Sequence, residues 1–387
     1  MRFKPLSHTT TILNQFLKLF PKSAFNSLAK DCPDKKRLRS YTRWDQFINL
    51  FSAQITGRVS LRDICDNFEV QTTKLSRCGA KPIPKSTFSR INEQQSCKLY
   101  EQLFNKLFSR CQPLSGKHKF KFKNPLYSMD ASTIDLCLSV FPWAKFRQAK
   151  GAIKLHVALN HSGLLPEFVS VSDGKKHEVN IGKTVTFPKE SIVAVDRGYI
   201  DYEWFNQLNT QSIYFVTRIK SNMKYKVKER RKYNKSKGVT CDQLIELASK
   251  KGLVYQGKLR RVGYKDPVTG KRYYFLTNNT RLAAQTIADI YKDRWQIELF
   301  FKWIKQNLKI KTFIGTSQNA VMTQIWIAMC VYLLIAYFKF LNGVKRSPME
   351  ILRILSLNWF EKRFLIELFD PPDKNPESYE ARQGSLL

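Results

Sequence analysis

The chain has 387 residues, of which 66 are Lys or Arg and 31 are Asp or Glu, so its formal net charge is +35. A hydrophobic fraction of 43% is enough for a sizeable core, which excludes a disordered chain, and the length predicts two or three domains. This excess of positive charge favours a polyanionic partner. Because the basic residues are spread over the whole chain, nucleic acid is favoured over a membrane surface.

Several other classes of protein are not expected. The longest apolar run, residues 325–338, is shorter than the roughly 20 residues of a bilayer-spanning helix, so it predicts a core helix, with a dimer contact as the alternative. The first 20 residues lack the pattern of a secretory signal. The eight cysteines are scattered without a CxxC pair, which argues against a zinc site or a disulfide scaffold and favours a cytoplasmic protein.

Residues 1–120 predict an all-helical N-terminal domain, because apolar residues recur there at helical spacing, and the basic charge makes DNA its expected partner. Ser60 is the expected N-cap of one helix, and Ser86 or Thr87 that of a longer one, residues 86–108. A short polar segment separates these helices. A helix-turn-helix DNA reader and an ordinary bundle with a solvated basic face both fit this pattern.

From residue 121 the pattern becomes strand-like. Residues 121–216 predict the first part of an α/β core, with a helix near His177–Val185 and a buried strand ending at Val195.

Residues 217–282 predict a basic β-rich insertion, in which residues 218–237 carry ten basic residues and one acidic residue. A solvated loop and a DNA-binding surface both fit this charge run, and its tyrosines favour DNA. The candidate DNA contacts there are Lys226, Arg230 and Arg231. Helical spacing resumes in residues 283–345, predicted as the second part of the core, and residues 346–387 are predicted to form a C-terminal helical tail.

The stretch "YKDRWQIELFFKWIK", residues 291–305, carries an acid inside an otherwise apolar helix. At about 100° per residue its polar side chains form one stripe, and the other sides are apolar, which indicates a helix packed into the protein. A carboxylate there is costly unless it pairs with a cation or binds a metal. An ion pair between Arg294 and Glu298, four residues apart, is the simpler explanation.

Two further acids favour a metal-binding role for Glu298 over the simple ion pair. Asp130 lies inside an apolar strand pattern, and Asp196 lies where a buried strand gives way to a turn. Strand ends are where α/β proteins present their chemistry. Together with Glu298, these aspartates form an oxygen ligand set suited to Mg²⁺ or Mn²⁺ and to phosphodiester chemistry.

These residues together resemble the DDE insertion-sequence transposases, in the branch known as the insertion sequence four family. The signature Y-x2-R-x3-E-x6-K of that family is matched without a change in spacing by Tyr291, Arg294, Glu298 and Lys305. Asp130 in "SMDAST" and Asp196 in "VDRGY" are similar to the contexts of the two catalytic aspartates. The resemblance covers about residues 125–345.

The resemblance implies an RNase H-like (retroviral-integrase-like) core interrupted by a β-rich insertion. It implies a metal-binding catalytic triad of Asp130, Asp196 and Glu298, with Mg²⁺ as cofactor and Mn²⁺ as its substitute. The residues implied to bind transposon DNA are Tyr291, Arg294, Trp295, Lys302 and Lys305.

The implied activity is cut-and-paste excision and strand transfer by a bacterial, cytoplasmic enzyme that is nucleoid-associated when bound to DNA. Its partners would be the inverted-repeat ends, the target DNA and a second copy of the chain, without a membrane. An RNase H-like nuclease without strand transfer and a non-catalytic DNA-binding protein derived from a transposase are the alternatives.

One departure from the family concerns the insertion. Members that release their element through a DNA hairpin carry a Trp there for a flipped base, and residues 217–282 contain none. Tyr225, Tyr233 or Tyr255 is the expected substitute, and the use of a hairpin stays open.

Other acids and histidines of the core are not expected in the site. The acids Asp135, Asp173 and Glu178 are interpreted as strand-end or turn residues. The irregularly spaced histidines, including His161, are not expected to bind metal.

Overall fold

The computed structural model describes residues 10–32, 38–147, 150–307 and 313–369. The chain divides into two compact units, Met1–Leu114 with Asn307–Leu387, and Ser115–Gln306. We call the first the helical unit and the second the sheet unit.

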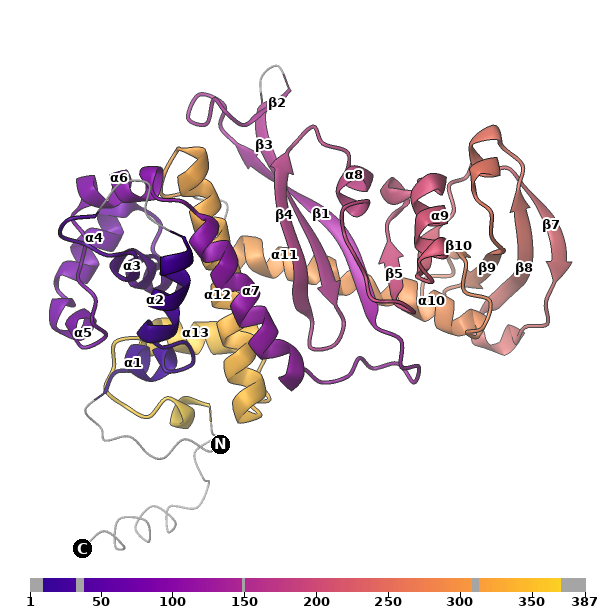
Figure 1. The fold of residues 1–387 in the computed structure, drawn as a ribbon. Coiled ribbons are helices and arrows are strands. Elements are labelled where there is room, and N and C mark those ends of the chain that lie inside the picture. Colours follow the sequence, from indigo (N-terminus) through magenta and orange to yellow (C-terminus); the bar gives the residue numbers. More distant parts are fainter. Residues whose placement is uncertain (1–9, 33–37, 148–149, 308–312, 370–387) are drawn as a thin grey trace, which may run out of the picture. The chain divides into compact units, whose positions relative to one another are not determined.

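The helical unit brings N-terminal and C-terminal segments together (Figure 1). Its α-helices are α1 (Ile12–Leu17), α2 (Lys22–Asp31), α3 (Arg43–Ile55), α4 (Leu61–Glu69), α5 (Thr72–Ser76), α6 (Lys85–Gln94), α7 (Lys98–Cys111), α12 (Gln318–Asn342) and α13 (Pro348–Asn358). Short 3₁₀ turns are η1 (Gln112–Leu114) and η5 (Ile366–Leu368). Helix α12 packs on α7, α3 and α6, so the division of the chain falls at Asn307 and differs from the predicted boundaries at residues 120 and 345.

Two helix starts were predicted here. Ser60 caps α4 as predicted, because its hydroxyl accepts a hydrogen bond from the backbone N–H of Asp63. The second prediction was wrong: α6 begins at Lys85 after Pro84, and it ends at Gln94 instead of continuing to residue 108. Its last carbonyls are capped from far along the chain, since the side-chain amide of Asn319 donates to the carbonyls of Asn92 and Gln95.

The predicted core helix is longer than its apolar run. Helix α12 extends to 25 residues because Ser317 caps its start, and Gly343 ends it with a φ of +64° that favours glycine. By length and composition this helix could cross a membrane, but 89% of its apolar 18-residue window is buried inside the protein. It is the central core helix of the helical unit.

The sheet unit is built on ten strands. These are β1 (Leu126–Leu136), β2 (Lys145–Arg147), β3 (Lys150–Asn160), β4 (Leu165–Asp173), β5 (Ile192–Val195), β6 (Tyr214–Arg218), β7 (Tyr225–Arg230), β8 (Val239–Leu247), β9 (Leu259–Lys265) and β10 (Arg272–Thr277). Its helices are α8 (Glu178–Gly182), α9 (Tyr202–Thr210), α10 (Ala284–Asp293) and α11 (Trp295–Asn307), with the 3₁₀ turns η2 (Arg197–Tyr199), η3 (Lys235–Lys237) and η4 (Lys250–Val254).

All ten strands belong to one mixed sheet. Its order is β2-β3-β1-β5-β6-β10-β9-β8-β7, and β4 pairs with β3. Strands β1, β3 and β4 are antiparallel neighbours, whereas β5 and β6 run parallel to β1. The predicted insertion therefore does not form a separate sheet, because β10 pairs antiparallel with β6 and carries β9, β8 and β7 outward.

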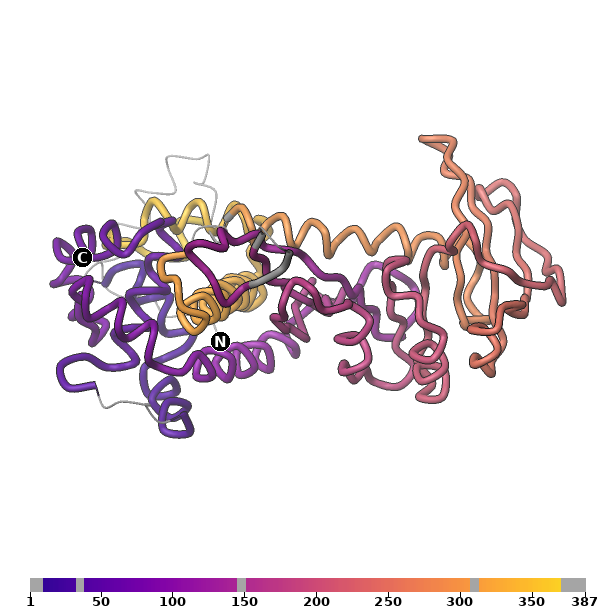
Figure 2. Tube along the Cα trace, turned by 90° about the horizontal axis from the view of Figure 1, so that it is seen from above, coloured from indigo at the N-terminus to yellow at the C-terminus, as the bar shows by residue number. Residues whose placement is uncertain are grey.

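Helices cover both faces of this sheet. Helix α10 supplies Ile287 and Ile290 to one apolar cluster, and α9 supplies Trp204 and Phe205 to the other. The stretch 291–305, predicted as one helix, is divided between two: α10 ends at Asp293 and α11 begins at Trp295, with Arg294 between them in an αR conformation. Figure 2 shows α10 and α11, in orange, continuing in one direction across this break.

Candidate active site

Asp130 and Asp196 lie side by side on two neighbouring interior strands of the sheet. Strands β1 and β5 are parallel neighbours, and their register pairs Met129 with Val195. The next residue along the chain is an aspartate in both cases: Asp130 continues β1, and Asp196 directly follows the end of β5. The apolar residues of β5 are fully buried, so the strand cannot slip by one residue without exposing them, and this fixes the two carboxylates as neighbours.

Arg294 joins two of the predicted carboxylates. Its Nη1 lies 2.9 Å from Oδ2 of Asp130, and its Nη2 lies 2.6 Å from Oε1 of Glu298. The Arg294 side chain is only 11% exposed, and the two carboxylates are 19% and 32% exposed. The ion pair expected from the four-residue spacing is therefore present, and Arg294 shares its guanidinium with Asp130.

Burial makes the charge of Asp130 costly. It raises the pKa of this carboxyl to about 6, and the nearby Glu178 and Asp196 act in the same direction. The charge of Arg294 and a 2.8 Å hydrogen bond from the backbone N–H of Ala131 oppose the increase. A nearby cation therefore stabilises the charged form of Asp130.

Two tyrosines complete the surroundings of the aspartates. The Tyr291 hydroxyl donates to Oδ1 of Asp196 over 3.3 Å. Burial raises the pKa of Tyr291 to about 12, so this hydroxyl keeps its proton. Tyr199 is fully buried, and its hydroxyl has no hydrogen-bond partner within the described ranges. Burial also raises the pKa of Tyr199, and the charges of Asp130, Glu178 and Asp196 add to this effect.

A buried polar chain holds the end of α10 against β1. Nε2 of His161 lies 2.7 Å from the Ser128 hydroxyl, and its Nδ1 lies 2.9 Å from Oδ2 of Asp293. Lys119 donates to the other carboxylate oxygen of Asp293 over 2.6 Å. Burial alone would raise the pKa of Asp293, but the hydrogen bonds from His161 and Lys119 lower it to about 2.

This set of hydrogen-bonded side chains holds Arg294 in position. Ser128 is two residues before Asp130, and Asp293 is directly before Arg294. Because the network links β1 to the last residue of α10, it holds the helix break where the guanidinium reaches both carboxylates. We call Ser128, His161 and Asp293 the buried polar chain.

Glu178 is a further acid beside the aspartates. It begins α8 and pairs with Lys154 over 3.3 Å. A Cβ built on Gly198 would lie 3.2 Å from Oε2 of Glu178, so glycine lets the turn after Asp196 approach this carboxylate. Glu178 was interpreted from sequence as a turn acid, and the structure places it next to the turn that carries Asp196.

An open cavity of about 420 Å³ adjoins the carboxylates. Asp196, Arg294 and Glu298 line it. Aromatic rings line it too, from Tyr264, Tyr273, Phe275, Tyr291 and Trp295. Anionic oxygen ligands, a cation and stacking surfaces thus face one space, a combination that suits a nucleotide.

The insertion contributes a tyrosine pair to this cavity. Tyr264 on β9 and Tyr273 on β10 are directly opposite in the strand register. Arg218 stacks on the Tyr273 ring at 4.8 Å. The tyrosines predicted for a stacking role lie elsewhere: Tyr255 is buried in the core, and Tyr225 packs against Arg261.

Of the other predicted DNA contacts, some are exposed and others are bonded within the protein. Trp295 is 57% exposed, and Lys302 is exposed as well. Lys305 donates to the carbonyl of Thr133 on β1 over 2.6 Å, which braces α11 against the strand that carries Asp130.

In the insertion, Lys226 and Arg230 are exposed on β7. Arg231 is half-buried and donates to the carbonyl of Thr280 over 2.9 Å, so it braces the insertion and is not free to extend into solvent.

The carboxylates are not gathered around one point in this conformation. In the described parts of the chain, no group of three or more His, Cys, Asp or Glu side chains is arranged to hold a metal ion. The Arg294 guanidinium lies between Asp130 and Glu298. The eight cysteines are all free thiols.

Sequence reasoning missed the buried polar chain, the tyrosine pair and Glu178. His161 and Asp293 are 132 residues apart, and no local pattern joins them. The alternation of "RYYFLT" could have placed Tyr273 and Phe275 on one face of a strand, but not opposite Tyr264.

Comparison with known proteins gives the family. Residues 121–334, more than half of the chain, match the family described as "Transposase DDE domain". Residues 8–81 match a domain family of unknown function, DUF4372.

Three relatives are described as transposases. A protein of Sinorhizobium fredii is 35% identical over 62% of this chain and 68% of its own length. A protein of Geobacillus stearothermophilus, described for the insertion sequence element IS5377, is 30% identical over 65% of this chain and 66% of its own length. A protein of a Synechocystis species, described for the element IS4SA, is 23% identical over 72% and 78%.

A solved piggyBac transposase synaptic complex with hairpin DNA covers 97% of this chain and 85% of its own chain at 12% identity. Its TM-score is 0.47. The family match and the Sinorhizobium relative are sufficient: this chain belongs to the insertion-sequence transposases that carry the DDE domain.

Proposed function

We propose that the chain excises its own insertion sequence and joins it to target DNA, with Asp130, Asp196 and Glu298 as the catalytic carboxylates. The observation that carries the proposal is the single network in which Arg294 links Asp130 to Glu298 while Tyr291 contacts Asp196. The three acids lie on β1, directly after β5 and on α11, and two of them, Asp196 and Glu298, line the open cavity.

The fold proposed for the core is RNase H-like. Support comes from the five strands in the order β4-β3-β1-β5-β6, of which the first three are antiparallel and the last two are parallel to β1. The acids lie on β1, after β5 and on a helix that follows the sheet.

The donor chemistry of the site fits a hard divalent cation, and we propose Mg²⁺, with Mn²⁺ as its substitute. Asp130, Asp196 and Glu298 would supply carboxylate oxygens, the ligands that Mg²⁺ prefers. Asp130 and Glu298 share one guanidinium, and the pKa of Asp130 is raised despite it, which indicates a site short of positive charge. When bound, such a cation activates the attacking oxygen and stabilises the leaving one.

The residues around the acids have different tasks in this proposal. Arg294 would transfer from the carboxylates to a DNA phosphate, for which its planar guanidinium is suited. Tyr291 and Lys305 would hold neighbouring phosphates. Trp295 and the tyrosine pair, Tyr264 and Tyr273, would receive a terminal base in the cavity, since aromatic faces stack on any base.

Strand transfer conserves the number of phosphodiester bonds. The freed 3′-hydroxyl of the element forms a bond to a target phosphorus while the bond from that phosphorus to the 3′ oxygen of the target breaks. The exposed Lys226 and Arg230, and exposed Lys302 on α11, would contact the DNA backbone outside the cavity.

We propose further that residues 1–120 bind the inverted-repeat ends and that two copies of the chain join two ends. The relatives described for insertion sequences support such a substrate. The net charge of +35 supports a DNA partner, and the organisms of the relatives support a bacterial cell.

Excision in cells tests the chemistry. A reporter flanked by the DNA that borders the chain's own gene is cut out by the wild-type chain, and Asp130→Asn is expected to abolish excision. Asp135→Asn is the matched control, because Asp135 lies on the same strand, is exposed, and is predicted to have no role. Unchanged excision by Asp130→Asn would show that the catalytic assignment is wrong.

Pre-cut element ends separate strand transfer from simple hydrolysis. Joined products in vitro are expected from the wild-type chain. Cut products alone would favour an RNase H-like nuclease, and DNA binding without any cleavage would favour a non-catalytic protein derived from a transposase.

A further inference from the structure

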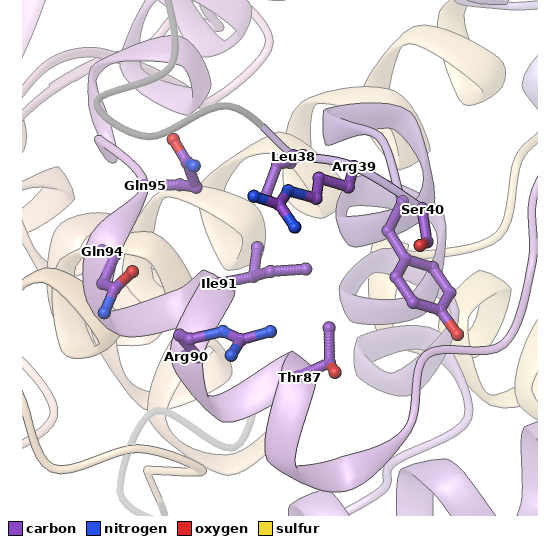
Figure 3. Close-up of a pocket in the computed structure, with 9 residues that line it drawn as sticks. Leu38, Arg39, Ser40, Thr87, Arg90, Ile91, Gln94 and Gln95 are labelled. Carbon is purple, nitrogen blue, oxygen red and sulfur yellow. The ribbon is translucent and has the colours of Figure 1, made fainter.

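The helical unit contains a polar hollow of about 470 Å³ beside α6 (Figure 3). Its walls are the segment 38–41 before α3 and one side of α6 with Gln95. None of its lining residues is acidic. The α6 hollow, as we call it, belongs to no site described above.

Two arginines share the α6 hollow. Figure 3 shows Arg39 and Arg90 extending over it from its two sides, with Ile91 between them. Both arginines are exposed, and neither has a hydrogen bond or ion pair with the described residues. Two like charges that face one hollow repel each other unless an anion lies between them. The hollow is thus arranged for an anionic group.

Neutral hydrogen-bonding groups accompany the arginines. Thr87 and Gln94 lie three residues before and four residues after Arg90, and this spacing places all three on one side of α6. The other side of α6 is anchored by the fully buried Phe88. A rigid helix therefore presents one cation between two neutral hydrogen-bonding side chains, and segment 38–41 adds the second cation.

We propose that the α6 hollow binds the phosphodiester backbone of DNA, with Arg39 and Arg90 each holding a phosphate. Guanidinium groups bind phosphate through paired hydrogen bonds, and Thr87 and Gln94 donate to the remaining oxygens. A free nucleotide offers the same phosphate chemistry. DNA is favoured because the chain is strongly basic throughout, so that a duplex meets attractive charge beyond the hollow as well.

This inference rests on the proposed function, because it assumes a DNA substrate. It adds a phosphate-binding position in the helical unit that acts in anchoring DNA and takes no part in cleavage. Phosphate contacts carry no sequence information of their own, so the α6 hollow contributes affinity on any duplex.

Salt-dependent binding to a fluorescent duplex of arbitrary sequence is the test, with the full chain and fluorescence anisotropy. The double variant Arg39→Gln/Arg90→Gln is expected to bind about tenfold or more weakly, and its slope of log affinity against log salt is expected to fall by about two. Arg353→Gln is the control, since Arg353 is exposed on α13 and does not line the hollow. Wild-type affinity and slope in the double variant would overturn the proposal.

Competition with ATP distinguishes the two phosphate sources. If ATP binds the wild-type chain, if the double variant loses ATP binding, and if duplex binding is unchanged, the hollow holds a free nucleotide and the DNA assignment is wrong. Thermal unfolding of both variants checks that they are folded. Both arginines are exposed, so near wild-type unfolding temperatures are expected.

Failure of this inference and failure of the proposed function give different results. Asp130→Asn is expected to abolish excision and to leave the salt slope unchanged. If excision survives Asp130→Asn while the double variant still loses slope, the catalytic assignment fails and the hollow stands. If excision is lost but the double variant binds like wild type, the hollow fails and the catalytic assignment stands.

Discussion

The sheet unit and the helical unit use arginine in opposite ways. In the sheet unit, one guanidinium, that of Arg294, is 11% exposed and serves two carboxylates at 2.6 and 2.9 Å. In the helical unit, Arg39 and Arg90 are exposed over the α6 hollow, which has no acid in its lining. The first arrangement is satisfied within the free protein, whereas the second has positive charge in excess.

A bound DNA phosphate is therefore expected to act differently at the two sites. The α6 hollow gains a partner when phosphate arrives and loses none. At the carboxylates, phosphate competes with Asp130 and Glu298 for Arg294, and release of the guanidinium leaves acids that a divalent cation can bind. DNA binding and metal binding are therefore expected to support each other in the sheet unit, but not in the helical unit.

The largest effect on stability is expected from Arg294→Gln. It leaves Asp130 and Glu298 without their cation, so the free energy of unfolding without metal falls by about 3 kcal/mol. Arg218→Gln is the control, because Arg218 lines the same cavity and stacks on Tyr273 without an ion pair in the described structure. Chemical denaturation measures both variants.

Metal binding to Arg294→Gln tests whether the guanidinium and a cation compete for the carboxylates. Adding Mg²⁺ without DNA is expected to raise the unfolding temperature of Arg294→Gln more than that of the wild-type chain, because the guanidinium no longer competes for the carboxylates. Equal shifts in the two proteins would contradict competition between Arg294 and the metal.

A smaller effect is expected from Asp293→Asn in the buried polar chain. Weakening its hydrogen bonds to His161 and Lys119 is expected to reduce the free energy of unfolding by about 1–3 kcal/mol. Asp289→Asn, on the same helix, is the control, since Asp289 is half-buried and accepts one hydrogen bond from Gln285. An equal loss of stability in both variants would show that the buried polar chain does not hold α10 in place.

The buried polar chain also predicts a pH dependence. The pKa of Asp293 is lowered to about 2, below its value of about 3.9 in the unfolded chain. Its stabilising contribution is therefore present above about pH 4 and is lost as the pH falls toward 2. Denaturation at several pH values is expected to show a smaller loss of stability in Asp293→Asn over this interval than in the wild-type chain.

The smallest effect is expected from the α6 hollow. Because Arg39 and Arg90 have no partner among the described residues, replacing both with Gln is expected to change the free energy of unfolding by less than about 0.5 kcal/mol. Denaturation without DNA measures this, and a loss as large as that of Arg294→Gln would remove the contrast between the two units.

Local patterns predicted the elements that carry the acids. Asp130 was predicted inside a strand and Asp196 at the end of another. The register of β1 and β5, which pairs Met129 with Val195, makes these two aspartates neighbours. The pair between Arg294 and Glu298 followed from the four-residue spacing, which is kept because Arg294 stays in an αR conformation directly before α11.

Contacts between distant segments could not be predicted in this way. The end of α6 depends on the Asn319 amide, which lies 224 residues beyond Gln95. The division at Asn307 depends on where α12 packs, and the joining of the insertion to the core sheet depends on the pairing of β10 with β6. These features depend on tertiary packing, which local sequence propensity does not describe.

Metal specificity at Asp130 tests the central claim most directly. A thiolate is a poor ligand for Mg²⁺ and is better tolerated by Mn²⁺, so Asp130→Cys should cut a duplex bearing the element's end at least about a thousandfold more slowly with Mg²⁺ and recover substantially with Mn²⁺. Asp135→Cys, on the same strand, should cut normally with both metals. Normal cutting by Asp130→Cys with Mg²⁺, or an equal loss with both metals, would contradict the role of Asp130 as a metal ligand.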